Sequence, residues 1–137
     1  MRTIPEAQLH RLTPHSIMAI WSGPAQTGGH RSDEIQYPQV LDGVVQYART
    51  EGPRRPAHEV AATLLYRLCH EQPFGDCNKR TGLIIATGLM ESAGFELTRP
   101  DSQVWVYLNK FATNFPTLDE FIAWFGASFE PFRGLGP

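Results

Sequence analysis

The stretch from His70 to Gly82 reads HEQPFGDCNKRTG, and it separates two segments whose apolar residues recur at helical spacing. It is therefore expected to form a short turn that leads into the start of a helix. At such a start, backbone N–H groups without helical acceptors and the helix dipole favour an anion. Lys79 and Arg80 add two positive charges at the same place. On physical grounds alone, the sequence predicts a phosphate-binding loop at a helix N-terminus.

The remaining residues of this loop can be interpreted with or without a ligand. Asp76 is the nearby carboxylate that could hold Mg²⁺ on a phosphate, whereas a capping role would need no metal. Asn78 either maintains the loop or contacts a phosphate. Phe74 is expected to anchor the loop in the core, and Gly75 to let the backbone approach a ligand. The predicted phosphate or nucleotide site consists of Phe74, Gly75, Asp76, Cys77, Asn78, Lys79 and Arg80.

Length and composition indicate a single domain over residues 1–137. A chain of this length, 42% hydrophobic and 19% charged, can bury a core of its own. The net charge of −2 gives no overall positive field, so no nucleic-acid partner is expected. No stretch approaches the roughly 20 apolar residues of a membrane span, and the first residues lack the apolar run of a signal peptide. We expect a cytoplasmic protein with reduced thiols and no membrane partner.

The apolar spacing and the Pro and Gly breaks predict an all-α fold. Thr13 and Pro14 form a suitable N-cap and first helical residue. Thr117 and Glu120 have the spacing of a capping box. Strand signals are weak along the chain. The expected helices are Pro5–Leu12, His15–Trp21, Pro38–Thr50, Ala57–Glu71, Thr81–Ala93, Pro100–Phe111 and Thr117–Phe129.

The sequence makes further predictions for one of these helices and for one loop. The helix Thr81–Ala93 is nearly all apolar, so we expect it to be buried on most sides, at the centre of a bundle. Gly94 is suited to end that helix. The segment Ser22–Tyr37 is rich in Gly, Pro and polar residues and is expected to be a long loop, with at most a short hairpin.

The central stretch also resembles a known family. Its segment PFGDCNKRT, residues 73–81, is similar to the Fic/Doc (Fido) signature HPFxDGNKRT. The Lys-Arg-Thr ending is closer to the Doc (death-on-curing) branch, and Leu89–Leu97 is similar to the family's helix end and exit. The resemblance implies a Fido-type helical bundle with the signature loop between two central helices. It covers most of the chain but is weak before Val60.

Three positions depart from the family pattern. The catalytic His of the family would fall at position 72, where this chain has Gln72. Cys77 stands where the family has Gly or Ala, and Leu83 stands where the strict Fic motif has Arg, as expected of the Doc branch. Gln forms hydrogen bonds but has no useful pKa for proton transfer, and loss of a general base typically lowers the rate about 10²–10⁴-fold.

Other groups near Gln72 are candidates for the missing chemistry. His70 is a substitute base only if the chain breaks at Glu71, because in a continuous helix it points away from position 72. Glu71 is a candidate on the same condition. Cys77 could be a nucleophile activated by the helix start and Lys79, although a small residue tolerated at that position is the simpler interpretation.

The resemblance implies a protein that binds ATP or another nucleotide, or a phosphorylated small molecule, together with Mg²⁺. The reaction would transfer phosphate or a nucleotide monophosphate to a hydroxyl of a protein target, and a separate antitoxin would be a conceivable partner. With Gln72 in the catalytic position, activity is low, or another base serves, or the reaction has changed. The alternative is a non-catalytic interaction module that kept the fold, such as a component of a toxin–antitoxin pair.

Overall fold

The structure is a computed structural model that describes residues 1–26 and 35–132. Over these residues it is mostly helical, which confirms the predicted all-α class, with one short two-stranded sheet. The hairpin considered within Ser22–Tyr37 falls largely outside the described residues. The elements are α1 (Glu6–Arg11), α2 (Pro14–Ser22), α3 (Pro38–Glu51), α4 (Ala57–Glu71), α5 (Asn78–Ser92), β1 (Phe95–Leu97), α6 (Asp101–Leu108), the 3₁₀ helix η1 (Asn109–Ala112), α7 (Leu118–Ala127) and β2 (Phe129–Pro131).

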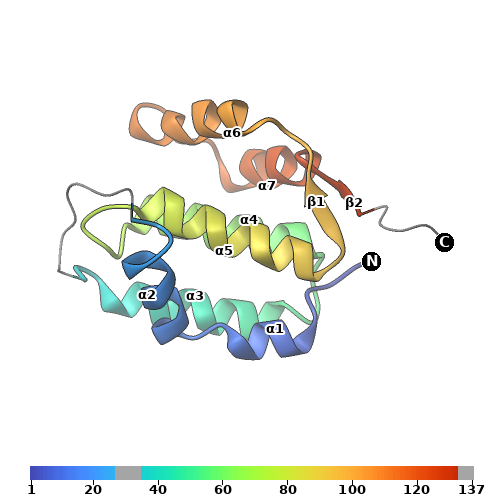
Figure 1. Cartoon of the computed structure of the whole chain (residues 1–137), viewed down its shortest axis with the longest axis horizontal. Helices are drawn as coiled ribbons and strands as arrows, with labels where there is room; N and C mark the ends of the chain where they lie inside the picture. The colour runs from blue at the N-terminus through green and yellow to red at the C-terminus, as the bar shows by residue number, and fades with distance from the viewer. Residues whose placement is uncertain (27–34, 133–137) are drawn as a thin grey trace.

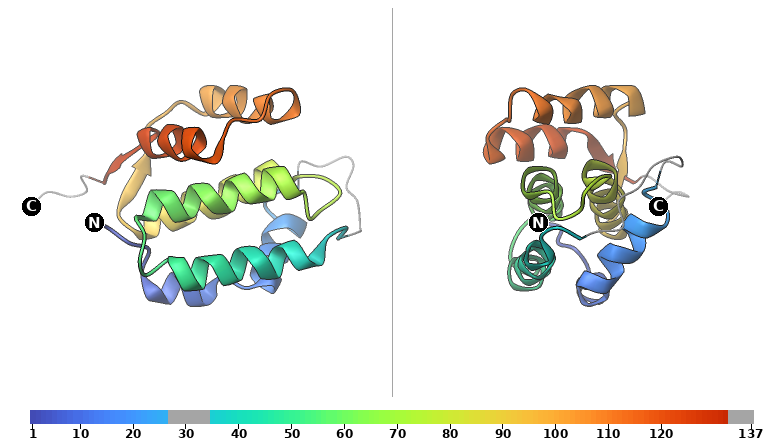
Figure 2. Two further views of the ribbon diagram at one scale, coloured as in Figure 1. Left: turned by 180° about the vertical axis from the view of Figure 1, so that it is seen from behind. Right: turned by 90° about the vertical axis from the view of Figure 1, so that its left-hand side faces the viewer.

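The helices are arranged in layers, with α4 and α5 packed along each other in the middle (Figure 1). Helices α1, α2 and α3 cover one side of this pair, and α6 and α7 cover the other (Figure 2). The loop between α4 and α5 lies at one end of the middle layer, beside the C-terminal end of α2 (Figure 1). No helix of the described segments is both long and apolar enough to cross a bilayer.

The helix boundaries follow the local signals closely. The side chain of Thr13 accepts a hydrogen bond from Ser16 N (3.0 Å), and Pro14 is the first residue of α2. Thr117 Oγ1 accepts from Glu120 N (3.1 Å) at the start of α7, as the capping box predicts. The Glu120 carboxylate, however, meets the Thr117 hydroxyl (3.0 Å) instead of its backbone N–H.

Helix α5 differs from its prediction at its start and on one face. It begins at Asn78, three residues before the predicted Thr81, because Cys77 turns the chain and precedes the first helical residue. Its residues Ala86 and Met90 are buried, whereas Ile84 and Ile85 are only half-buried beside a groove that α1 and α2 leave open. The expectation that α5 lies at the centre of the bundle is therefore confirmed, whereas its face at Ile84 and Ile85 is covered only in part.

The C-terminal region contains the strands that the sequence did not reveal. Strands β1 and β2 pair antiparallel, with Leu97 opposite Phe129 and Phe95 opposite Pro131. Helix α7 therefore ends at Ala127, before the predicted Phe129, since Phe129 belongs to β2. This ladder connects the end of α5 to the end of α7 and ties the α6–α7 layer to the middle pair (Figure 1). Gly94 has φ of +90° and directly precedes β1, which confirms it as the residue that ends α5.

Candidate functional site

The loop between α4 and α5 is bounded by two residues in the left-handed conformation. Gln72 (φ 46°) ends α4, and its N–H donates to Leu68 O at 3.2 Å. Cys77 (φ 57°) precedes α5. Left-handed backbone is strained for residues with a side chain, and such strain is concentrated at functional sites. Gly75 is not one of the left-handed positions, because the glycine with positive φ among the described residues is Gly94.

Asn78 holds the loop closed from inside. Its Oδ1 accepts from Phe74 N (3.0 Å), and its Nδ2 donates to Phe74 O (3.1 Å). The side chain is 9% exposed, so both polar ends are used in a buried position. Of the two roles considered for Asn78, the structure shows the one that maintains the loop.

Phe74 anchors the loop in the core, as predicted. Its ring is 1% exposed and stacks on Trp21 with 4.6 Å between centroids and 3° between planes. Trp21 Nε1 also donates to Asp76 O at 3.1 Å. The Phe74 side chain therefore supports the loop from the core and does not line the pocket. Its inclusion among the predicted ligand-binding residues is wrong, and its role is to support the loop.

The chain that enters α3 is also joined to this loop. Gln36 N and Tyr37 N both donate to Pro73 O, at 2.8 Å and 3.0 Å, and Ile35 forms an isolated antiparallel bridge with Phe74. Pro73 is buried. The loop is thus held by α2, by the start of α3 and by its own Asn78.

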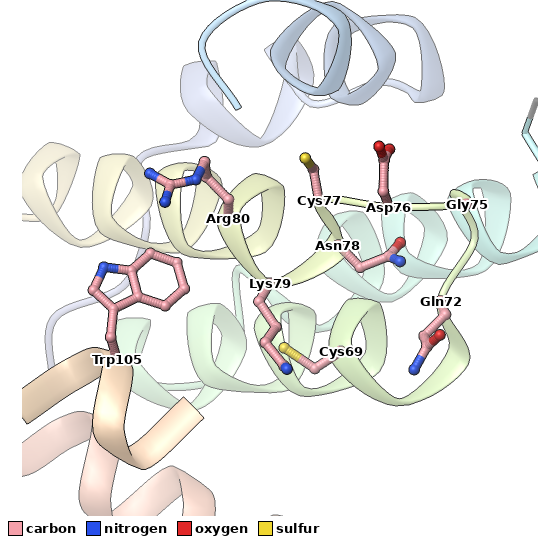
Figure 3. Close-up of a pocket in the computed structure, with 9 residues that line it drawn as sticks. All are labelled: Cys69, Gln72, Gly75, Asp76, Cys77, Asn78, Lys79, Arg80 and Trp105. Carbon is pink, nitrogen blue, oxygen red and sulfur yellow. The ribbon is translucent and has the colours of Figure 1, made fainter. Parts of the chain in front are cut away.

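A pocket of about 320 Å³ opens at the start of α5 (Figure 3). In this view the side chains of Asp76 and Cys77 point to one side of the loop, whereas Lys79 points to the other. Arg80 extends toward Trp105, which comes from α6. The lining residues are Cys69, Gln72, Gly75, Asp76, Cys77, Asn78, Lys79, Arg80 and Trp105.

The first turn of α5 carries uncompensated positive charge. No acidic residue lies in that turn, and the N-cap side chain does not cap the helix. The first helical hydrogen bond runs from Thr81 N to Cys77 O (2.9 Å), so the N–H groups of Asn78, Lys79 and Arg80 precede the helical ladder. Within residues 1–26 and 35–132, neither Lys79 nor Arg80 forms an ion pair. Two cations therefore add to the positive end of the helix dipole.

The two cysteines at the pocket are thiols and do not form a disulfide. Burial raises the pKa of Cys69 to about 12, and the nearby Lys79 opposes this shift only in part. Cys69 is consequently a neutral thiol at physiological pH and a poor nucleophile.

His70 does not reach the pocket. Helix α4 continues through Glu71, so the break that would redirect His70 is absent. Its ring packs against Phe115, with 4.4 Å between centroids, and lies beside Tyr66. Glu71 is paired with Arg67 at 2.7 Å. Neither candidate base is brought to Gln72 in this conformation.

Two lining residues were not predicted from the sequence as part of this site. Cys69 lies one turn before the end of α4, and its helical position could have suggested it. Trp105 belongs to α6, and no local pattern connects it with the loop. Its ring lies 4.9 Å from Arg80 Cζ, measured to the ring centroid. Trp105 is brought to the pocket by this contact between α6 and α5, which the sequence does not reveal.

Asp76 is the carboxylate that lines the pocket. Over the described part of the chain, no three His, Cys, Asp or Glu side chains form a metal-binding cluster. Mg²⁺ commonly binds through one or two carboxylates and the phosphates of a substrate, and a single Asp fits that arrangement.

Comparisons with known proteins gave no assignment. No protein-family model matches the chain, and no curated protein matches it either.

Proposed function

We propose that this protein is a small Doc-like member of the Fido family that binds a nucleotide or another phosphoryl donor at the start of α5. The observation that carries the proposal is the pair Lys79 and Arg80 in the first turn of α5, without a carboxylate partner among the described residues. Cations at a helix N-terminus oppose the dipole, so their presence is unfavourable until an anion binds. The order of residues 73–81, which resembles the Fido signature, supports the same assignment.

The roles of the loop residues follow from their positions. Lys79 and Arg80 would take phosphate oxygens, Arg80 with two donors, and the N–H groups of the first turn would complete the cradle. Asn78 and Phe74 keep the loop in shape from the core side. Asp76 would hold Mg²⁺, which would neutralise phosphate charge when bound. The left-handed φ at Cys77 is a conformation that Gly adopts without strain, and Gly is one of the two residues that the family has at this position.

Gln72 limits the chemistry of the proposed site. It occupies the position of the family's catalytic His, and it can hold a target hydroxyl by a hydrogen bond but cannot accept its proton usefully. Positioning and charge stabilisation can persist without a base. We therefore propose intact donor binding with weak transfer of phosphate or nucleotide monophosphate to a protein hydroxyl.

The second candidate is a non-catalytic interaction module with the same fold. The absence of His70 and Glu71 from the pocket favours it, because it removes the nearest substitute bases. The retained charges at Lys79 and Arg80 favour the first candidate, since a scaffold has no need of them.

The test is a titration of the purified protein with ATP and other nucleotides, with and without Mg²⁺, beside the Gln72→His variant. Binding and transfer to protein are both measured. We expect both proteins to bind nucleotide and only the Gln72→His variant to transfer phosphate or nucleotide monophosphate efficiently. Binding by neither protein would overturn the phosphate site and favour the interaction module, and efficient transfer by the wild type would show that another group serves as base.

A further inference from the structure

Arg80 has an aromatic partner where an arginine commonly has a carboxylate. Its guanidinium lies over the ring of Trp105, 4.9 Å from the centroid. Both side chains line the pocket at the start of α5. Trp105 is half-buried and is the lining residue contributed from outside residues 69–80.

A second arginine–tryptophan pair, within the α6–α7 layer, shows a different arrangement. Arg99 Cζ lies 5.1 Å from the Trp124 centroid, and Arg99 Nε also donates to Ser128 Oγ at 2.7 Å. Trp124 in turn stacks on Tyr107, with 3.9 Å between centroids. Arg99 is thus fixed by a hydrogen bond at the strand β2 end of the layer, whereas Arg80 has its ring contact alone among the interactions seen in the described residues.

We propose that Trp105 is a positioning residue that holds Arg80 toward the phosphate of the bound ligand. This inference rests on the proposed function, and it deepens the account of the same site. A carboxylate partner would orient Arg80 but would also neutralise it and compete with the ligand. An aromatic face orients the planar guanidinium while its charge and N–H donors remain available to an anion.

The contact also links two layers of the fold. Trp105 lies on α6, and the cations lie on α5 (Figure 3). In this proposal, the position of α6 sets the direction of the Arg80 side chain. Trp105 then affects ligand affinity through its contact with Arg80. Losing the ring leaves Arg80 charged but mobile, so the ligand must then restrain it on binding.

The test measures pyrophosphate affinity for four proteins by calorimetry at low ionic strength: wild type, Trp105→Phe, Trp105→Leu and Trp124→Leu. We expect Trp105→Leu to weaken binding about three- to tenfold, the effect of a lost cation–π contact on affinity. Trp105→Phe keeps an aromatic face and should recover most of that loss. Trp124→Leu is the matched control, since it removes the other arginine–tryptophan contact, and it should leave the affinity unchanged.

A double-mutant cycle separates positioning from general packing. In the Arg80→Gln background, Lys79 and the helix N–H groups still attract pyrophosphate, and Trp105→Leu should then have no further effect. Site-specific replacement of Trp105 by a ring-fluorinated tryptophan keeps the shape, weakens the π face and should lower affinity. This variant covers the case in which Trp105→Leu fails to fold.

The outcomes distinguish the two levels of the account. If wild type binds pyrophosphate and Trp105→Leu and the fluorinated protein bind equally well, the positioning role is overturned and the proposed site stands. An equal loss in the presence and absence of Arg80 would also overturn it, because the effect would then be structural. If wild type does not bind pyrophosphate, the proposed phosphate site fails, and this inference fails with it.

Discussion

Two pairs of adjacent cations lie beside the starts of neighbouring helices, and they differ in whether carboxylates of the chain pair with them. Arg54 and Arg55 precede α4, and both are paired with Glu51, at 3.8 Å and 2.7 Å. Arg55 also approaches Glu59 at 3.4 Å. The hydrogen bond from Arg55 holds the pKa of Glu51 below its ordinary value, as expected of a stable pair. The first pair is therefore neutralised within the chain.

The second pair, Lys79 and Arg80, lies inside the first turn of α5 and has no carboxylate partner in the described segments. The backbone differs as well. Helix α4 follows Pro56 (φ −56°), an unstrained start, whereas α5 follows the left-handed Cys77. Charge without a partner and strained backbone occur together at the same loop. The two starts therefore differ in whether the chain itself neutralises the cations, and only the α5 start combines unpaired cations with a pocket among the described residues.

The largest expected effect comes from removing each pair in turn. The double variant Lys79→Gln/Arg80→Gln should weaken nucleotide or pyrophosphate binding by about 100-fold, because two charge-assisted contacts are lost. The matched control Arg54→Gln/Arg55→Gln should bind as wild type does. Calorimetric titration measures both, and equal losses from the two double variants would contradict the comparison.

The next largest effect concerns the side chain that keeps the α5 loop closed. Asn78→Ala removes both hydrogen bonds to Phe74 and leaves buried backbone groups without partners, so it should lower the free energy of unfolding by about 2–3 kcal/mol. Thr117→Ala, which removes the exposed cap of α7, should cost about 1 kcal/mol. Urea denaturation compares the two, and a smaller loss for Asn78→Ala would show that the loop does not depend on this residue.

Relief of backbone strain should have a smaller effect of opposite sign. Cys77→Gly removes a left-handed side-chain residue and should raise the free energy of unfolding by about 1 kcal/mol. Gln72→Gly should act in the same direction, since Gln72 is exposed and also left-handed. Thermal unfolding measures both variants. If both glycine variants were less stable than the wild type, the contacts of the two side chains would contribute more to the free energy of unfolding than the backbone strain costs.

The smallest expected effect is on the free energy of unfolding, which the unpaired charge of Lys79 lowers. Without ligand and at low salt, Lys79→Gln should raise the free energy of unfolding by about 0.3–1 kcal/mol, because Lys79 opposes the dipole of α5. Arg55→Gln should lower it, since it breaks the pairs with Glu51 and Glu59. Saturating pyrophosphate should reverse the order of wild type and Lys79→Gln by stabilising the wild type. A lower stability of Lys79→Gln without ligand would contradict the account.

Much of the helical framework could be predicted because its signals are local. Helix α4 was predicted with its observed bounds, Ala57–Glu71, since Pro56 and the loop residues interrupt the chain clearly on both sides. The capping residues Thr13 and Thr117 marked two further starts. Strands β1 and β2 were missed because each has three residues, and their pairing joins segments about thirty positions apart in the chain.

The candidate site was predicted only in part, for the same reason. The loop composition indicated the cations and the core anchor Phe74, which depend on neighbours in sequence. The left-handed conformations of Gln72 and Cys77, the role of Asn78 and the contact of Arg80 with Trp105 depend on how the chain closes in space. The partly covered face of α5 was missed because hydrophobicity indicates that a residue can be buried but not how far its neighbours cover it.

The most direct test of the central claim is an amide chemical-shift titration with pyrophosphate. We expect saturable shifts of the backbone N–H signals of Asn78, Lys79 and Arg80 and of the Trp105 indole N–H. The signals of Arg54, Arg55 and the first turn of α4 should stay in place. Saturable shifts centred on the α4 start, or no saturable shift at the start of α5, would contradict the assignment of a phosphate site to the first turn of α5.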